Sequence, residues 1–439
     1  MYFMKELLIA LYKQQLNKIN ENLKDVKVVF FENINYELDI ELIDKSPCVM
    51  NSYIVYQWLL NKKELPQKIY FFDNGALGFF CIQAKRVLGL FKHVEFEIVP
   101  MGKTYYNYAR KDEWGYGKAY DLKLSYMEDY CLREESIAGV NNNEPLISVC
   151  ISHFNHGKYL PETLEALAES TYKNFEVIVV DSESNDPYSI EVFNDMENKY
   201  KKNFKFYHRK NESLGETRNH AVEEANGDYI IFFDSDNIPE NNMIELYVKG
   251  MNISGCDCLT AHNMQFEDEM NDLLFTPIGP ALAYGIFENC FGDSAFCIKK
   301  NVFKELGGFT AERLGLEDWE FLAKVSIKGY KQDVVPLPIY RYRRNRSSMA
   351  NTVNNYRSHN RVLRSYIENE KPYIKDLLTQ FCIPVYKNGY KQYENIDETC
   401  NPVEGIYMGG IIIKFIKIVK KLVPKKGHLY NKLKKFLKR

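Results

Sequence analysis

Three near-continuous apolar runs between residues 147 and 233 constrain the fold more than any other feature of the sequence. ISVCI begins at residue 147, FEVIVV at 175 and YIIFF at 229, with helix-like segments such as PETLEALAEST and ETRNHAVEEAN between them. Strands that are apolar on both sides are typical of parallel sheets covered by helices, because parallel neighbours need a crossover connection. The sequence therefore predicts an α/β fold with a Rossmann-like, mostly parallel sheet and helices on both faces.

The chain of 439 residues is long enough for more than one domain. The runs VKVVFF, KIYFFD and VEFEIVP predict a smaller α/β domain over residues 1–143, which ends in three consecutive asparagines. The main α/β domain is expected at 144–350, a helical extension at 351–403 and a basic tail at 404–439. The opening segment, MYFMKELLIALYKQQL, predicts an amphipathic first helix and not a signal peptide.

Composition narrows the class of protein. A run of about 18 uncharged apolar residues is missing, so the sequence predicts no membrane-spanning helix. The 10 cysteines lack the spacing of a zinc site and are interpreted as reduced thiols of a cytoplasmic protein. The net charge of −2 hides an asymmetry, since residues 404–439 carry +10 and the first 403 residues carry −12.

The strongest candidate site is Asp234-Ser235-Asp236, directly after the run YIIFF. Ligands of open α/β sheets bind beyond the carboxyl ends of the strands, and two carboxylates there can bind a hard divalent cation that holds a diphosphate. The alternative is an ordinary turn or a helix cap.

Two further residues are expected at the same edge of the sheet. Asp181 ends the run FEVIVV, where its carboxylate can accept hydrogen bonds from a uracil imide or from ribose hydroxyls; a simple polar turn is the alternative. Arg218 lies in the segment NESLGETRNHAVEEANGDY and is expected to point into the cleft as a partner of a diphosphate or a base. A surface charge on a helix is the alternative for Arg218.

A fourth element is the acidic start of the helix EDWEFLAKVSIKGY, which follows the glycine-rich segment GGFTAERLG. Acids at a helix N-terminus are also favoured by the helix dipole alone. The order and spacing of the four elements resemble the family 2 glycosyltransferases of GT-A fold, over about 146–345. ISVCISHFNHGKYL, which contains Phe154 and Asn155, is similar to the first-strand motif of that family.

The resemblance implies a set of roles. Phe154, Asn155, Asp181, Arg218, Asp234 and Asp236 would bind a nucleotide-sugar donor, with Asp236 also holding Mn²⁺ or Mg²⁺. Asp318 would be the general base, and Glu317 and Trp319 would lie on the acceptor side. Direct displacement with inversion would need no covalent nucleophile, and a carboxylate base suits an acceptor hydroxyl of very high pKa.

The chain departs from the family pattern in three places. Ser152 and His153 replace the usual Pro and Thr, and Glu183 replaces a glycine. After the last strand, PIYRYRRNRSSM lacks the histidine of many members, but Arg343 and Arg346 would be able to clamp diphosphate oxygens. A solvated basic loop is the alternative.

Residues 68–138 bear a weaker resemblance to the N-terminal half of GT-B glycosyltransferases of the glycogen-synthase kind. A second donor-binding half does not follow, and Gly75 and Gly78 alone do not form a phosphate-binding motif. This domain is therefore expected to be non-catalytic, with a role in acceptor binding or docking. A remnant without function is the alternative.

The basic tail has helical amphipathicity, with side chains such as Ile411 and Phe415 on one face and lysines such as Lys417 and Lys420 on the other. This pattern predicts a helix on an anionic membrane surface, and packing against the acidic body is the alternative. Nucleic-acid binding is not predicted, because no matching fold signature accompanies the charge.

Together these features predict an inverting, metal-dependent glycosyltransferase that is cytoplasmic and peripherally bound to the inner face of the cell membrane. It would move a sugar from a nucleotide-diphosphate sugar, UDP-linked, to a hydroxyl of a saccharide or lipid-linked acceptor in bacterial surface polysaccharide or glycolipid synthesis. Two alternatives are a sugar-nucleotide or carbohydrate-binding scaffold without turnover and a nucleotidyltransferase on a related fold. The latter would want a glycine-rich first loop, and residues 147–155 contain no glycine.

Overall fold

The computed structural model describes residues 6–10, 26–100, 119–133, 143–210, 213–267, 270–344 and 355–367. The chain divides into two compact units, 1–368 and 369–439, and all of these residues belong to the first. Among them, no helix is both long and apolar enough to cross a bilayer. The predicted basic tail and most of the predicted helical extension lie outside the described residues.

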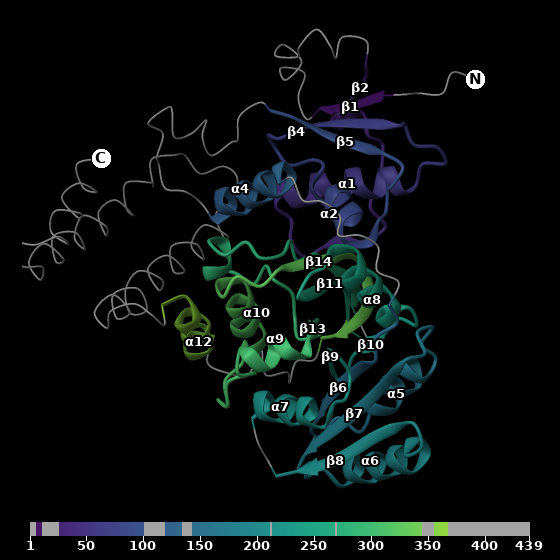
Figure 1. The fold of residues 1–439 in the computed structure, drawn as a ribbon, viewed down its shortest axis with the longest axis vertical. Coiled ribbons are helices and arrows are strands. Elements are labelled where there is room, and N and C mark those ends of the chain that lie inside the picture. Colours follow the sequence, from purple (N-terminus) through teal and green to yellow (C-terminus); the bar gives the residue numbers. More distant parts are fainter. Residues whose placement is uncertain are drawn as a thin grey trace, which may run out of the picture. The chain divides into compact units, whose positions relative to one another are not determined.

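The three apolar runs form central strands of a 10-stranded sheet (Figure 1). Four neighbouring strands in the order β9-β6-β7-β8 are all parallel. They are β6 (Ile147–His153), β7 (Phe175–Ser182), β8 (Phe204–Arg209) and β9 (Tyr229–Asp234). Their carboxyl ends therefore meet at one edge of the sheet.

The other half of this sheet is mixed. Beyond β9 the order continues β13-β11-β14-β10, with β13 antiparallel to β9 and to β11, and β14 parallel to β11. β12 and the short β3 extend β11 as a side branch. The strands are β3 (Glu41–Leu42), β10 (Ile238–Pro239), β11 (Cys258–Glu267), β12 (Met270–Phe275), β13 (Cys297–Lys299) and β14 (Gln332–Arg343). By this arrangement the start of β13 and the end of β14 lie at the same edge as the end of β9.

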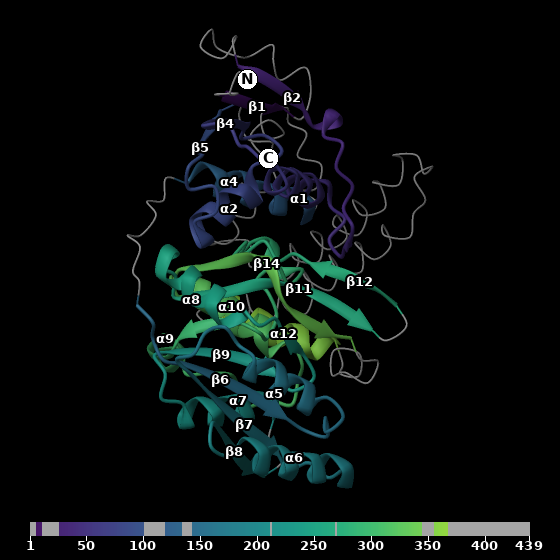
Figure 2. The same ribbon diagram turned by 90° about the vertical axis from the view of Figure 1, so that its right-hand side faces the viewer.

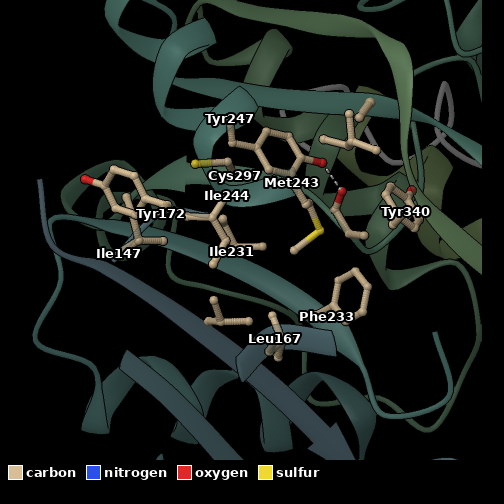
Figure 3. Packing of buried hydrophobic residues seen from close by; sticks show 14 of the residues in the cluster. Ile147, Leu167, Tyr172, Ile231, Phe233, Met243, Ile244, Tyr247, Cys297 and Tyr340 are labelled. Carbon is tan, nitrogen blue, oxygen red and sulfur yellow. Dashed lines mark hydrogen bonds between the residues drawn. The ribbon is translucent and has the colours of Figure 1, made fainter. Parts of the chain in front are cut away.

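Helices cover both faces of the sheet, as predicted. Side chains along β9 alternate between the two faces. Ile231 and Phe233 join the core with α5 and α8 (Figure 3), whereas Phe232 packs on Phe303 of α9 on the other face. The helices are α5 (Leu160–Ala168), α6 (Pro187–Tyr200), α7 (Leu214–Glu224), α8 (Met243–Ser254), α9 (Lys300–Glu305), α10 (Glu317–Ile327) and α12 (Asn355–Ile367), with the 3-10 turn η4 (Tyr284–Ile286).

The first domain has its own four-stranded parallel sheet in the order β2-β1-β4-β5 (Figure 2). Its elements are β1 (Glu6–Ala10), β2 (Lys27–Phe30), η3 (Phe31–Asn33), α1 (Pro47–Leu60), β4 (Lys68–Phe72), α2 (Phe79–Leu88), β5 (Glu95–Val99) and α4 (Ala119–Leu132). The predicted amphipathic helix at the N-terminus is wrong, because Glu6–Ala10 is a strand. Four consecutive buried residues between two parallel neighbours suit a central strand and not one face of a helix.

The two sheets are joined within one compact unit. Asp333, buried at the start of β14, accepts hydrogen bonds from Gln83 Nε2 at 3.0 Å and from the Tyr130 hydroxyl at 2.7 Å. Gln83 belongs to α2 and Tyr130 to α4, so the first domain holds one end of the strand whose other end reaches the site.

Candidate active site

The carboxyl edge of the main sheet brings together four parts of the chain. Asp234 ends β9 and Asp236 follows it, Asp181 is the last residue but one of β7, and the segment before β13 and the last residues of β14 reach the same edge. The sequence predicted the first three residues at this edge, and the topology adds the other two segments.

Arg218 lies at the centre of this edge and is buried, with 1% of its surface exposed. Its Nη2 donates to Asp234 Oδ1 and its Nη1 to Glu317 Oε1, both at 2.6 Å. The alternative of a surface charge is therefore wrong. Because Arg218 bridges two carboxylates, it joins the D-x-D strand to the first residue of α10.

Asp234 is held from both of its oxygens. In addition to Arg218, the Ser294 hydroxyl donates to Oδ2 at 2.6 Å. Burial alone would raise the pKa of Asp234, but the charge of Arg218 and the hydrogen bond from Ser294 hold it below its usual value. Asp234 is therefore a fixed anion.

Asp236 has a different environment. Burial and the neighbouring charge of Asp234 raise the pKa of Asp236 to about 6, although His156 and Arg343 act in the opposite direction. Its backbone carbonyl accepts a hydrogen bond from Arg343 Nε at 3.0 Å. A bound cation would stabilise the charged form of this carboxylate. Carboxylate oxygens are suitable ligands for Mn²⁺ or Mg²⁺. The donor set at Asp236 thus fits the predicted metal.

Asp318 lies in the first turn of α10, which starts after Leu316 in the left-handed conformation, with φ of 66°. Burial and the adjacent Glu317 raise the pKa of Asp318 to about 7, against the opposing charge of Arg218. A carboxylate with a pKa near neutrality is suited to proton transfer at physiological pH.

The start of α10 is fixed by α12. Arg361, fully buried on α12, donates to Glu320 Oε2 at 2.6 Å and to the backbone carbonyls of Thr310 and Leu314 at 2.7 Å. These bonds tie the glycine-rich segment before Asp318 to the helix that carries it. The family resemblance gave no sign of Arg361.

Glu317 and Trp319, predicted on the acceptor side, are both buried. Glu317 pairs with Arg218, and the Trp319 indole nitrogen donates to the Gly285 carbonyl at 2.9 Å. Successive residues of a helix point about 100° apart, so a helix that turns Asp318 outward turns its neighbours inward. This burial favours support of Asp318 by the two side chains, and contact of either with an acceptor stays a prediction.

Asp293 is a further acid at this edge that the sequence analysis missed. Its carboxylate accepts hydrogen bonds from Asn263 Nδ2 at 2.8 Å, from the backbone N–H of Ala295 at 3.0 Å and from the Tyr340 hydroxyl. Burial raises the pKa of Asp293 to about 7, and Asp234 adds to the effect. The only sequence signal was an acid between Gly292 and Ser294 before a short apolar run.

A separate cavity of ≈ 360 Å³ lies beside Asp181. Asp181 Oδ1 accepts a hydrogen bond from the Ser184 hydroxyl at 2.5 Å, and His208 Nδ1 lies 3.5 Å from Oδ2. The cavity is lined by Asp181, Glu183, Ser184, Ile190, Phe193, His208, Arg209 and Lys210. A planar group that can donate a hydrogen bond to the Asp181 carboxylate would suit this cavity.

Phe154 and Asn155 lie in the loop after β6 and do not line the cavity. The Asn155 side chain is engaged by the loop after β7, because its Oδ1 accepts from the backbone of Asn185 and Asp186 at 2.9 and 3.0 Å. Phe154 is 40% exposed. The structure therefore gives Asn155 a role in joining two loops, and leaves a donor contact of Phe154 as a prediction.

Of the two predicted arginines, Arg346 lies outside the described residues. The Arg343 guanidinium lies 4.5 Å from the ring centres of Tyr159 and Phe266, and its Nη2 donates to Glu162 at 2.6 Å. Arg343 is thus held against the D-x-D turn, which argues against the alternative of a freely solvated side chain.

The buried bridge of Arg218 leads to a prediction about stability. Arg218→Met should lower the free energy of unfolding by about 3–5 kcal/mol, because Asp234 and Glu317 would lose their buried cation. Urea unfolding followed by circular dichroism measures this. Arg364→Met, which breaks an exposed pair with Glu312, should cost less than about 1 kcal/mol. Equal losses in the two variants would contradict the bridge.

Comparison with known proteins agrees with this geometry. Residues 148–279 match the model of Glycosyl transferase family 2. An uncharacterized glycosyltransferase of Methanocaldococcus jannaschii is 26% identical over 46% of this chain and 71% of its own length. Glycosyltransferase GlyG of Streptococcus pneumoniae is 27% identical over 40% of this chain, which spans only 52% of that relative.

Among solved structures, the mannosyltransferase PcManGT of Pyrobaculum calidifontis, in complex with GDP-Man and Mn²⁺, aligns with a TM-score of 0.48 and 15% identity. The alignment covers 69% of this chain and 89% of that one. The predicted fold class and enzyme class are confirmed in that the sheet is mixed α/β and mostly parallel and the relatives are glycosyltransferases. Over residues 148–279 the chain is thus similar to the family 2 glycosyltransferases.

Proposed function

We propose that the chain is an inverting, metal-dependent glycosyltransferase that takes its sugar from a uridine-diphosphate donor. The observation that carries the proposal is the Arg218 bridge, which places the D-x-D strand and the helix of Asp318 at one edge, beside the cavity at Asp181. A donor lying along this edge would have its base in the cavity, its diphosphate at Asp236 and its sugar toward Asp318.

Each residue has a defined task in this reaction. Asp181 accepts a hydrogen bond from the imide N–H of the base, and Asp234 accepts from ribose hydroxyls. Asp318 takes the proton of the acceptor hydroxyl while that oxygen forms a bond to the anomeric carbon and the bond to the diphosphate oxygen breaks. One displacement inverts the anomeric centre, and the products are the glycoside, the nucleoside diphosphate and a proton on Asp318.

Mn²⁺ or Mg²⁺ bound at Asp236 would neutralise charge on the departing diphosphate. Arg343 supports this arrangement because it fixes the backbone at Asp236. A preorganised site of this kind does not have to reorganise as charge develops during the reaction.

Contacts of the first domain reach the neighbourhood of Asp318. Lys123 of α4 lies 4.6 Å from the ring centre of Tyr284, and the carbonyl of the next residue, Gly285, accepts the indole N–H of Trp319. Trp319 adjoins Asp318. We therefore assign to the first domain a non-catalytic role in acceptor binding or docking.

A panel of nucleotide sugars tests the function. Each is incubated with the enzyme and Mn²⁺, Mg²⁺ or chelator, and the release of free nucleoside diphosphate is measured with and without saccharide acceptors. The proposal expects metal-dependent release with uridine-linked donors. Tight binding of a donor without any release would instead support a binding scaffold, and release of pyrophosphate from a nucleoside triphosphate would support a nucleotidyltransferase.

The acceptor is proposed to be a saccharide or lipid-linked molecule of bacterial surface polysaccharide or glycolipid synthesis. The basis is the sequence of residues 404–439, which lie outside the described residues and carry +10 with regular apolar side chains. Such a segment lies on anionic lipid, where each cation contributes about 1 kcal/mol. Attachment at the inner face of the membrane would bring the site to a lipid-borne acceptor.

Truncation after Glu404 should therefore abolish sedimentation with vesicles that contain phosphatidylglycerol at low salt. Transfer to a soluble acceptor analogue should be unchanged, because the described site ends before the tail. The attraction should weaken with added salt, since about 0.15 M reduces the screening length to about 8 Å. Failure of the full-length protein to sediment at low salt would contradict the membrane proposal.

A further inference from the structure

His156, which the sequence analysis did not single out, lies beside the D-x-D turn. It belongs to the loop between β6 and α5, and its Nδ1 is 3.9 Å from Asp236 Oδ2. The His156 side chain is 38% exposed and that of Asp236 15%, so both open toward the same accessible edge of the sheet.

The backbone holds His156 at this position. The carbonyl of His156 accepts hydrogen bonds from the N–H groups of Tyr159 and Leu160, at 2.9 and 3.1 Å. The following Gly157 donates to the Ser189 hydroxyl at 3.0 Å, and a Cβ at Gly157 would come within 2.5 Å of Ser189 Cα. The imidazole therefore projects from a loop packed closely against the first turn of α6, and not from a free surface turn.

The backbone that carries the Asp236 carboxylate is also held in place. Arg343 donates through Nε to the carbonyl of Asp236 and through its backbone N–H to Asn237 Oδ1, each at 3.0 Å. Two rigid turns from different parts of the sheet thus present one nitrogen and one oxygen to each other.

A separation of 3.9 Å is too long for a hydrogen bond between the two atoms. It is a suitable separation for two ligands of one cation, since ligand atoms about 2.0–2.1 Å from an ion lie about 2.9–4.2 Å apart. Within the described part of the chain, no cluster of three or more histidine, cysteine or acidic side chains could hold a metal ion. A cation here would therefore have few protein ligands and would take its others from phosphate and water, as Mg²⁺ commonly does.

We propose that His156 Nδ1 and Asp236 Oδ2 are both protein ligands of the divalent cation that holds the donor diphosphate. The inference rests on the proposed metal dependence and adds a ligand from the β6–α5 loop, outside the D-x-D motif.

Electron spin-echo spectroscopy of Mn²⁺ tests this without turnover. The full chain is mixed with Mn²⁺ and inorganic pyrophosphate, which contains no nitrogen, so that any ¹⁴N coupling comes from the protein. The wild type should show imidazole ¹⁴N coupling, and His156→Gln should lose it. Mn²⁺ affinity should fall at least about 10-fold in that variant, the least that loss of an outer-shell partner usually costs.

Two controls define the outcome. His93→Gln changes an exposed histidine of the first domain and should leave the coupling and the affinity unchanged. His156→Lys places a positive charge at this position but cannot bind the metal at neutral pH. Full Mn²⁺ affinity in this variant would overturn the inference in favour of a charge contact to phosphate. Mn²⁺ binding without ¹⁴N coupling in the wild type would also overturn it while leaving metal dependence intact, whereas no Mn²⁺ binding at all would overturn both.

Discussion

Asp236→Asn should abolish transfer, with a loss of about 10³-fold or more in kcat. Removal of the ligand charge takes away the cation that neutralises the departing diphosphate, which is worth several kcal/mol, and each about 1.4 kcal/mol is tenfold in rate. The fold should survive. Since burial and Asp234 raise the pKa of Asp236 to about 6, its charge is unfavourable in the folded protein, and a neutral amide relieves that cost.

The measurement is nucleoside diphosphate release at saturating Mn²⁺, together with thermal unfolding of the same preparation. Asp195→Asn, an exposed position on α6, serves as the matched control and should retain full activity. Full activity of Asp236→Asn in the presence of a chelator would remove Asp236 from the metal site.

Asp318→Asn should lower kcat by about 10²–10⁴, the usual contribution of a general base, and should leave donor affinity unchanged. The reason is that Asp318 lies on α10, while the base cavity at Asp181 and the carboxylate of Asp236 belong to other elements. Calorimetry of UDP with Mn²⁺ measures the donor affinity. An equal loss of donor affinity and kcat would assign Asp318 to the structure of the site instead.

The same residue is expected to determine the pH dependence of the reaction. Asp318 accepts a proton only when ionised, and burial with Glu317 raises its pKa to about 7. The value of kcat/KM should therefore fall about tenfold per pH unit below pH 7. The charge of Asp293 contributes to the raised pKa of Asp318. Asp293→Asn should therefore move the acidic fall of kcat/KM to lower pH. If the acidic fall of kcat/KM stays at the same pH in Asp293→Asn, the group that titrates is not Asp318.

The strands and the acids that follow them were predictable because each depends on local sequence. Fully buried parallel strands need apolar runs, which is why β6, β7 and β9 were found at their observed places. Once those strands are located, the positions of Asp181, Asp234 and Asp236 at their carboxyl ends are predictable. The N-terminal strand Glu6–Ala10 was missed because five apolar-rich residues do not distinguish a helix from a strand without their neighbours.

The parts that could not be predicted depend on contacts distant in sequence. Arg218 was expected to face the donor, but Glu317, 99 positions later, binds one of its two terminal nitrogens. Asp293 reaches the site only because β13 runs antiparallel to β9, a pairing that no local pattern reveals. His156 was missed for the same reason, because its relevance depends on the nearby Asp236, which follows a different strand.

We expect the donor diphosphate and its cation to bind at the edge that Asp236 occupies. A crystal structure of the full chain with UDP and Mn²⁺, with anomalous diffraction to locate manganese, is the decisive measurement. An anomalous peak in contact with Asp236 Oδ2 and the diphosphate, with uracil in the cavity beside Asp181, is the expected result. UDP bound at another part of the chain, or at this edge with manganese remote from Asp236, would show that the donor site is wrongly assigned.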